Sequence, residues 1–297
     1  MTRPAITCVA PTGDVVGEAA TWSADEDRLY WVDIGRFLVH VLNVRTGAVT
    51  SRFFDEPAVA LSMTDVPGRL LVALSSRLVY LDVESDARHD LGITLDDFPT
   101  ARFNDGRTDP NGAFWVGSMG NNVGPHGESI DMAEDAGRLF RYRAGGGLEE
   151  LESGIGISNT VCWAPDGKTF YFGDTLKNEI RAYPYDPASG DIGPGTPHFA
   201  GFDRGLPDGS AIDSEGFLWN CRFGGGCIVR VAPDGTVDRV IEMPVKNITT
   251  CTFGGPGLKT LYVTTAALQK AVTDRLAGSV FAIEADVAGM DENRFRT

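Results

Sequence analysis

Five polar side chains stand at a similar distance before an aromatic strand, and this shared spacing could bring them together in one site. They are two carboxylates, two amides and one hydroxyl, each 11 to 13 residues before a tryptophan or tyrosine: Glu18, Asn104, Asn159, Asp208 and Thr250. Carboxylate and amide oxygens suit a hard divalent cation such as Ca²⁺, Mg²⁺ or Mn²⁺. Zn²⁺ or Fe²⁺ is also compatible, although no histidine or cysteine shares the spacing. The alternative is a solvated channel lined by polar side chains without a metal.

The elements that must position these side chains repeat along the chain. Each copy has a turn rich in Asp, Pro, Asn or Gly, then an apolar strand, then a second strand, as in APDGKTFYFGD followed by EIRAYPYD. Equivalent positions in the six copies lie 40, 44, 56, 48 and 43 residues apart: Trp31, Leu71, Trp115, Tyr171, Trp219 and Tyr262. Six copies of this length, without a helical apolar period, predict an all-β, six-bladed β-propeller. A pair of β-sandwiches with chance similarity is the alternative.

The propeller hypothesis gives the polar residues a common place. Because they share one phase of the repeat, they are expected at one height on equivalent strands, in a ring around the axis; only the second copy breaks the run, with Val59 and Ala60. The N-terminal strand AITCVA is expected to pair with the last blade and close the ring. Residues 1–297 would then form one propeller domain, and the polar stretch 120–135 would be an excursion over one face.

Composition excludes several classes of protein. The chain has 36 glycines in 297 residues without a Gly-X-Y period, which indicates turns rather than collagen. Its formal charge of −15 argues against nucleic acid and anionic membrane surfaces as partners. No stretch approaches the roughly 18 apolar residues of a spanning helix, and no secretory signal is evident. Five scattered cysteines without a CxxC pair indicate reduced thiols and a cytoplasmic protein. The oligomeric state is not predicted.

Nucleophilic hydrolase motifs are missing from the chain. No GxSxG elbow occurs, and the four histidines are dispersed: His40, His89, His126 and His198. A Ser-His-Asp hydrolase is therefore disfavoured.

Five blocks of the sequence closely resemble signature stretches of the regucalcin/gluconolactonase (senescence-marker-protein-like) family of six-bladed propellers. In family order they are GEAATWSADEDRLYWVDI, RFNDGRTDPNGAFWVGSM, GISNTVCWAPDGKTFYFGDT, LPDGSAIDSEGFLWNC and TTCTFGGPGLKTLYVTTA, and the resemblance spans roughly residues 14–285. It implies a divalent metal on the axis and hydrolysis of sugar lactones to aldonic acids in carbohydrate metabolism. Glu18, Asn159 and Asp208 are similar to the three metal ligands of the family, and Arg102 and Asn104 to its substrate-contacting pair.

The chain departs from the family pattern at two places. Thr160 follows the ISN block, where the family usually has glycine. Asn121 and Asn122 occupy a stretch in which regucalcin-like members place an acidic substrate-contacting residue, so Asn122 is a candidate substrate contact.

The resemblance implies an ester-bond hydrolase with Asp208 as general base besides metal ligand. Arg102 would stabilise developing negative charge and Asn104 would bind vicinal hydroxyls. His126 and Arg222 are either solvent-facing loop residues or contacts to a distal substituent of the sugar, neutral or anionic. The alternatives to a sugar lactonase are a paraoxonase-like lactonase or esterase of other substrates and a metal-binding propeller without turnover.

Overall fold

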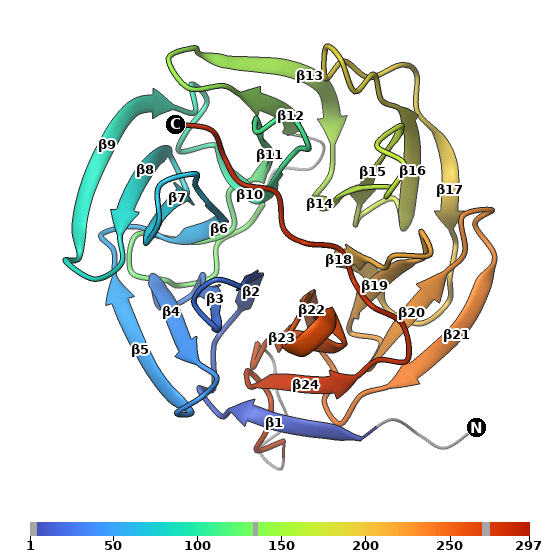
Figure 1. Cartoon of the computed structure of the whole chain (residues 1–297). Coiled ribbons are helices and arrows are strands. Elements are labelled where there is room, and N and C mark those ends of the chain that lie inside the picture. The colour runs from blue at the N-terminus through green and yellow to red at the C-terminus, as the bar shows by residue number, and fades with distance from the viewer. Residues whose placement is uncertain (1–4, 133–135, 269–273) are drawn as a thin grey trace.

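Six four-stranded antiparallel sheets surround a central axis in the computed structural model, which describes residues 5–132, 136–268 and 274–297 (Figure 1). The predicted six-bladed β-propeller is therefore confirmed. Within the described ranges the one helical element is the short 3₁₀ helix η1 (Pro256–Leu258). No helix there is long and apolar enough to cross a membrane.

The blades follow one another along the chain, and each begins with its innermost strand. The first three blades are β2 (Gly17–Ser23), β3 (Arg28–Asp33), β4 (Leu38–Asn43) and β5 (Ala48–Phe53); β6 (Ala58–Met63), β7 (Arg69–Leu74), β8 (Arg77–Asp82) and β9 (Ala87–Thr94); and β10 (Ala101–Thr108), β11 (Phe114–Gly120), β12 (Gly137–Tyr142) and β13 (Leu148–Ile155). The last three are β14 (Ser158–Trp163), β15 (Thr169–Asp174), β16 (Glu179–Pro184) and β17 (Thr196–Ala200); β18 (Leu206–Ile212), β19 (Leu218–Phe223), β20 (Cys227–Val231) and β21 (Val237–Glu242); and β22 (Ile248–Gly254), β23 (Thr260–Thr265), β24 (Val280–Glu284) and β1 (Ile6–Ala10).

The ring closes through the N-terminal strand, as the sequence predicted. Strand β1 pairs antiparallel with β24, so that Thr7 faces Ala282 and residues from both ends of the chain complete the sixth blade (Figure 1). This pairing removes the free edge that β24 would otherwise expose.

The repeated aromatic positions form the packing between blades. All six lie on the second strand of their blade and are buried, as the repeat predicted. Three indole N–H groups donate to buried aspartates at 2.8–2.9 Å: Trp31 to Asp14, Trp115 to Asp109, and Trp219 to Asp213. These three buried indole N–H groups thus have the partner that a buried donor needs, whereas those of Trp22 and Trp163 have none among the described residues.

The C-terminal segment crosses the axis at the end where the innermost strands finish (Figure 1). Phe295 is fully buried there and stacks on Tyr142 with ring centroids 5.5 Å apart. Glu292 accepts a hydrogen bond from the Thr252 hydroxyl at 2.7 Å. The segment therefore covers the far end of the axial channel, opposite the beginnings of the strands.

Candidate active site

Each innermost strand carries a β-bulge, and on every one except β6 the bulge lies at the polar residue that the shared spacing selected. On β2, Glu18 pairs with Val32, but the next regular pair is Thr21 with Tyr30. The same shift in register follows Asn159 on β14, and equivalent shifts occur on β6, β10, β18 and β22. A bulge re-aims a side chain relative to the regular alternation of a strand. The shared spacing of the polar residues in the sequence thus corresponds to a β-bulge that recurs on every innermost strand.

Residues after the bulged positions adopt a backbone conformation that L-residues seldom use. Ala19 has φ 54°, Asp105 has φ 42° and Thr160 has φ 56°, all in the left-handed region. Such a residue is strained by about 1–2 kcal/mol relative to the right-handed region. Thr160 thus holds a conformation that glycine adopts without this strain.

Two buried carboxylates from different blades, Glu18 and Asp208, lie next to one another. Glu18 and Asp208 are 8% and 7% exposed. Each accepts a backbone N–H, Glu18 from Ala19 at 3.0 Å and Asp208 from Gly209 at 3.1 Å, and among the described residues neither forms an ion pair. Burial, followed by the charges of Asp208 and Asp105, raises the pKa of Glu18 well above its ordinary value. Burial and the charge of Asp105 likewise raise the pKa of Asp208.

Asn159 adds an amide oxygen with no hydrogen-bond donor in the described part of the chain. Its Nδ2 donates to the Thr175 hydroxyl at 2.8 Å, which leaves Oδ1 as the free atom of the amide. Two carboxylates without an ion-pair partner among the described residues and one free amide oxygen, contributed by three blades, form an oxygen-donor set that fits a hard divalent cation. A cation would also remove the repulsion that raises the two pKa values.

A second group of possible metal ligands consists of Asp14, Asp33 and His40, and its two carboxylates pair with an arginine. Its ligand atoms lie within 4.8 Å of one another, but the Arg36 guanidinium pairs with both carboxylates, with Nη2 2.6 Å from Asp14 Oδ1. Asp14 also accepts the Trp31 indole N–H at 2.8 Å. Because this cluster already contains a cation, it is best described as an ion-pair network under the first blade.

Arg102 and Asn104, the predicted substrate-contacting pair, are held in one network with Asn122. Arg102 donates from Nε and Nη2 to Asn122 Oδ1 at 3.0 and 2.8 Å, and from Nη1 to Asn104 Oδ1 at 2.8 Å. Asn104 Nδ2 in turn donates to the Ser158 carbonyl in the neighbouring blade at 2.8 Å. Burial lowers the pKa of Arg102 to about 10, so the guanidinium still carries its charge at neutral pH.

The polar stretch after β11 runs over one face, as the sequence predicted. Gly127 of the third blade lies against the Gly35 carbonyl of the first, where a Cβ would come within 2.5 Å of that oxygen. His126 is exposed on this loop, and its backbone N–H donates to Glu128. Of the predicted excursion, residues 133–135 lie outside the described residues. The substrate contact assigned to His126 stays a prediction.

Arg222 is buried in this structure, and its guanidinium hydrogen-bonds the loop before β18. It is 1% exposed, and its donors reach Arg204 O at 3.1 Å, Gly205 O at 2.6 Å and Asn220 Oδ1 at 3.1 Å. Asn178 Oδ1 accepts a further hydrogen bond at 2.7 Å. The side chain therefore hydrogen-bonds the loop before β18 and does not face solvent. A contact between Arg222 and substrate stays a prediction.

Four further residues belong to the site, and the sequence analysis did not assign them a role. Asp105 contributes a third carboxyl group. Thr160 Oγ1 donates to the carbonyl oxygen of Asp208 at 2.6 Å and Asn220 Nδ2 donates to the same oxygen at 3.2 Å, while the Thr175 hydroxyl accepts from the Asn159 side chain at 2.8 Å. One signal was available for Asn220, because it interrupts the otherwise apolar strand LWNC. The threonines carry no such signal.

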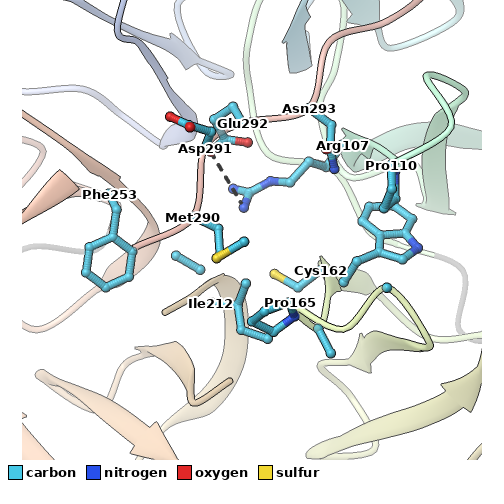
Figure 2. A pocket seen from close by; sticks show the side chains of 14 residues that line it. Arg107, Pro110, Cys162, Pro165, Ile212, Phe253, Met290, Asp291, Glu292 and Asn293 are labelled. Atoms are coloured by element: carbon cyan, nitrogen blue, oxygen red, sulfur yellow. Dashed lines mark ion pairs between the residues drawn. The ribbon is translucent and has the colours of Figure 1, made fainter. Parts of the chain in front are cut away.

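A cavity of about 220 Å³ lies at the opposite end of the channel, under the C-terminal segment (Figure 2). Arg107 and Glu292 point into it, with Nη1 and Oε1 3.8 Å apart, beside Cys162, Met290 and Phe253. None of the predicted site residues lines this cavity. The oxygen-donor set is thus found only at the end where the innermost strands begin, as far as the described residues show.

Comparison with known proteins places the chain in a family. Residues 16–267 match the model of the SMP-30/Gluconolactonase/LRE-like region. The chain belongs to this family. It is 34% identical to a 6-deoxy-6-sulfogluconolactonase of Pseudomonas putida and 34% identical to a pentonolactonase of Haloferax volcanii, in each case over 97% of both chains. It also superposes on a calcium-binding protein, regucalcin, of Agrobacterium tumefaciens with a TM-score of 0.91, 28% identity and full coverage of both chains.

These relatives confirm the resemblance inferred from the five sequence blocks and the assignment to the lactonase type of ester-bond hydrolase. They also support a divalent metal in the family, because one of the similar structures is named as a calcium-binding protein. The individual site residues rest on the geometry described above.

Proposed function

We propose that this chain is a metal-dependent hydrolase that opens the ring of a sugar lactone to give the aldonic acid in carbohydrate catabolism. The observation that carries the proposal is the pair of neighbouring buried carboxylates, Glu18 and Asp208, beside the free Oδ1 of Asn159. Relatives named for the hydrolysis of sulfogluconolactone, pentonolactone and L-arabinolactone support a sugar lactone as the substrate class.

Glu18, Asn159 and Asp208 would hold the metal. A bound divalent ion supplies a Lewis acid for the lactone carbonyl and lowers the pKa of a coordinated water. The all-oxygen donor set favours Ca²⁺, Mg²⁺ or Mn²⁺ over Zn²⁺ or Fe²⁺, which prefer nitrogen or sulfur ligands more strongly.

Asp208 is the proposed general base. A carboxylate oxygen of Asp208 takes a proton from the attacking water while the water oxygen forms a bond to the carbonyl carbon. The ring C–O bond then breaks, and the proton passes from Asp208 to the departing alkoxide. The products are the open-chain carboxylic acid, with no other reactant consumed than water.

Arg102 is the proposed stabiliser of the oxyanion. Its hydrogen bonds to Asn122 and Asn104 fix the guanidinium before substrate arrives, so little reorganisation is needed when negative charge develops. Asn104 would add an amide contact to a sugar hydroxyl. Because Arg102, Asn104 and Asn122 are cationic or neutral, this side of the site complements the negative charge that develops on the lactone carbonyl oxygen.

We further propose a cytoplasmic location, because Cys8, Cys162, Cys221, Cys227 and Cys251 are all free thiols. Such a location suits an enzyme of sugar catabolism.

The test is acid release from a panel of aldono-lactones, with and without a chelator, by the unaltered chain and by Asp208→Asn. The charge-matched control is Asp65→Asn, because Asp65 is exposed on the opposite face. We expect turnover that requires metal, falls at least about 100-fold in Asp208→Asn and is unchanged in Asp65→Asn. Activity on non-sugar esters alone would favour the paraoxonase-like alternative, and background rates throughout would favour a binding propeller. Activity that survives the chelator would contradict the metal mechanism.

A further inference from the structure

The hydroxyl of Thr175 stands between two of the proposed metal ligands. It accepts the Asn159 Nδ2 hydrogen bond at 2.8 Å and donates to the carbonyl oxygen of Pro207 at 2.7 Å. Pro207 directly precedes Asp208, so one side chain contacts the amide of the first ligand and the backbone of the second. We propose that Thr175 is a positioning residue that sets Asn159 and Asp208 relative to one another; this inference rests on the metal site of the proposed function.

The direction of these two hydrogen bonds follows from their chemistry. A carbonyl oxygen can only accept, so the single hydroxyl hydrogen of Thr175 is used by Pro207. The hydroxyl oxygen can therefore only accept from Asn159, and it must face the amide nitrogen rather than the amide oxygen. As a result Oδ1 of Asn159 is the atom left for a cation. Thr175 thus decides which end of the amide is presented to the metal.

The two bonds also connect neighbouring blades. Asn159 lies on β14 of the fourth blade, Thr175 follows β15 of the same blade, and Pro207 lies on β18 of the fifth. The next carbonyl, that of Asp208, accepts from Thr160 of the fourth blade at 2.6 Å. Two hydroxyls of one blade therefore hold two consecutive carbonyls of the next, which fixes the backbone from which the Asp208 carboxylate projects.

Thr175 is itself held from several sides. It is 7% exposed, and its backbone N–H donates to the Ile157 carbonyl at 3.0 Å. The preceding residue, Asp174, accepts backbone N–H groups of Gly156 at 3.0 Å and Leu176 at 3.2 Å. The hydroxyl is thus placed by the fold before any ion binds. Outer groups that orient ligands in this way typically change metal affinity by about 10- to 100-fold when they are removed.

Both the hydrogen and an acceptor site of the Thr175 hydroxyl are used within the protein, so its role is to position the ligands rather than to contact substrate. The matched control is Thr64, a buried threonine at the opposite end of the propeller. Its hydroxyl lies 3.1 Å from the Val66 carbonyl and 3.0 Å from the Arg69 carbonyl, so Thr64→Val removes comparable bonds away from the site.

The experiment is a titration of the full chain with Ca²⁺, and separately with Mn²⁺, by isothermal calorimetry. We expect the Kd of Thr175→Val to rise about 10- to 100-fold. Thr175→Ser, which keeps the hydroxyl, is expected to bind within about threefold of the unaltered chain, and Thr64→Val within about twofold, because neither substitution removes a ligand contact.

A Thr175→Val protein that binds both ions as tightly as the unaltered chain would overturn the proposal. So would a Thr175→Ser protein as weak as Thr175→Val, because the hydroxyl would then not be the active group. If the unaltered chain binds neither ion, the metal site and the positioning role are both wrong. The titration does not depend on turnover, so a chain that binds Ca²⁺ through this network but hydrolyses no lactone would refute the proposed reaction alone.

Discussion

Thr160 combines an unfavourable backbone conformation with two short hydrogen bonds and a longer one from Asn220 Nδ2 at 3.4 Å, so its replacement tests strain against hydrogen bonding. The residue is fully buried with φ 56°. Its hydroxyl donates to the Asp208 carbonyl at 2.6 Å and lies 2.8 Å from Ser210 Oγ. Three substitutions separate the contributions: Thr160→Gly removes the strain and the hydroxyl, Thr160→Val removes only the hydroxyl, and Thr160→Ser removes only the β-branch.

The magnitudes follow from the geometry. In Thr160→Gly, relief of the left-handed strain stabilises the fold by about 1–2 kcal/mol. The greater freedom of glycine in the unfolded chain costs about 0.5–1 kcal/mol, and the two lost hydrogen bonds cost about 1 kcal/mol each. The net expectation is a loss of about 1 kcal/mol, moderated because Asn220 still donates to the Asp208 carbonyl at 3.2 Å. Thr160→Val keeps the strain and loses the hydroxyl bonds, so it should lose about 2–3 kcal/mol.

The assay is urea unfolding of the metal-free proteins, followed by the same measurement with Ca²⁺. We expect the free energy of unfolding to be nearly equal for Thr160→Ser and the unaltered chain, lower for Thr160→Gly and lowest for Thr160→Val. If Thr160→Gly were more stable than the unaltered chain, the strain would exceed the hydrogen bonds and the reasoning would be refuted. Equal stability of Thr160→Val and the unaltered chain would show that the hydroxyl contributes nothing.

Three further expectations concern charge and packing. Burial and neighbouring carboxylates raise the pKa values of Glu18 and Asp208, so the folded metal-free chain binds protons more readily than the unfolded chain. The free energy of unfolding should therefore fall as pH rises from about 4, the ordinary pKa of these groups in the unfolded chain, through their raised pKa values in the folded chain. Urea unfolding of the unaltered chain and Glu18→Gln across this range checks it, and a Glu18→Gln profile parallel to that of the unaltered chain would contradict it. Arg102→Lys cannot reproduce the paired hydrogen bonds to Asn122 Oδ1, so kcat/KM for a hydrolysed lactone should fall about 10- to 100-fold, and unchanged kinetics would remove Arg102 from the mechanism. Phe295→Ala should lose about 3–5 kcal/mol in urea unfolding with Ca²⁺ affinity retained, since the ring is fully buried at the opposite end; a loss below about 1 kcal/mol would show that the segment does not stabilise the propeller.

The sequence predicted the architecture because the propeller repeats a local pattern. The equivalent positions recur with each blade, aromatic in all but the second, where Leu71 stands, and every one of them lies on the second strand of its sheet. The pairing of the N-terminal strand with β24 was also predictable, because closure is the way a propeller removes its last edge. The loop over one face was visible as a polar stretch without strand alternation, and Gly127 confirms where it runs.

The candidate site could be predicted in part for the same reason. Glu18, Asn159 and Asp208 share one phase of the repeat, and the structure places each of them on an innermost strand beside a bulge. The bulge itself left no recognisable mark. Ala19 and Thr160 occupy left-handed positions that residue type would assign to glycine, so propensity alone would not place them there.

What the sequence alone determined is therefore the number of blades, the strands that compose them and the height of the polar ring, all of which depend on patterns within about 50 consecutive residues. Only the tertiary structure decided which groups hold the ring in place. Thr160 bonds to Asp208 across 48 residues, Thr175 reaches Pro207 across 32, and Asn104 reaches Ser158 across 54. Such bonds join neighbouring blades, and the repeat predicts that these strands are neighbours but not which side chain bonds which carbonyl. A threonine that orients a ligand has the same composition and local pattern as one that only fills the core, and the difference lies in the residue that the fold brings opposite its hydroxyl.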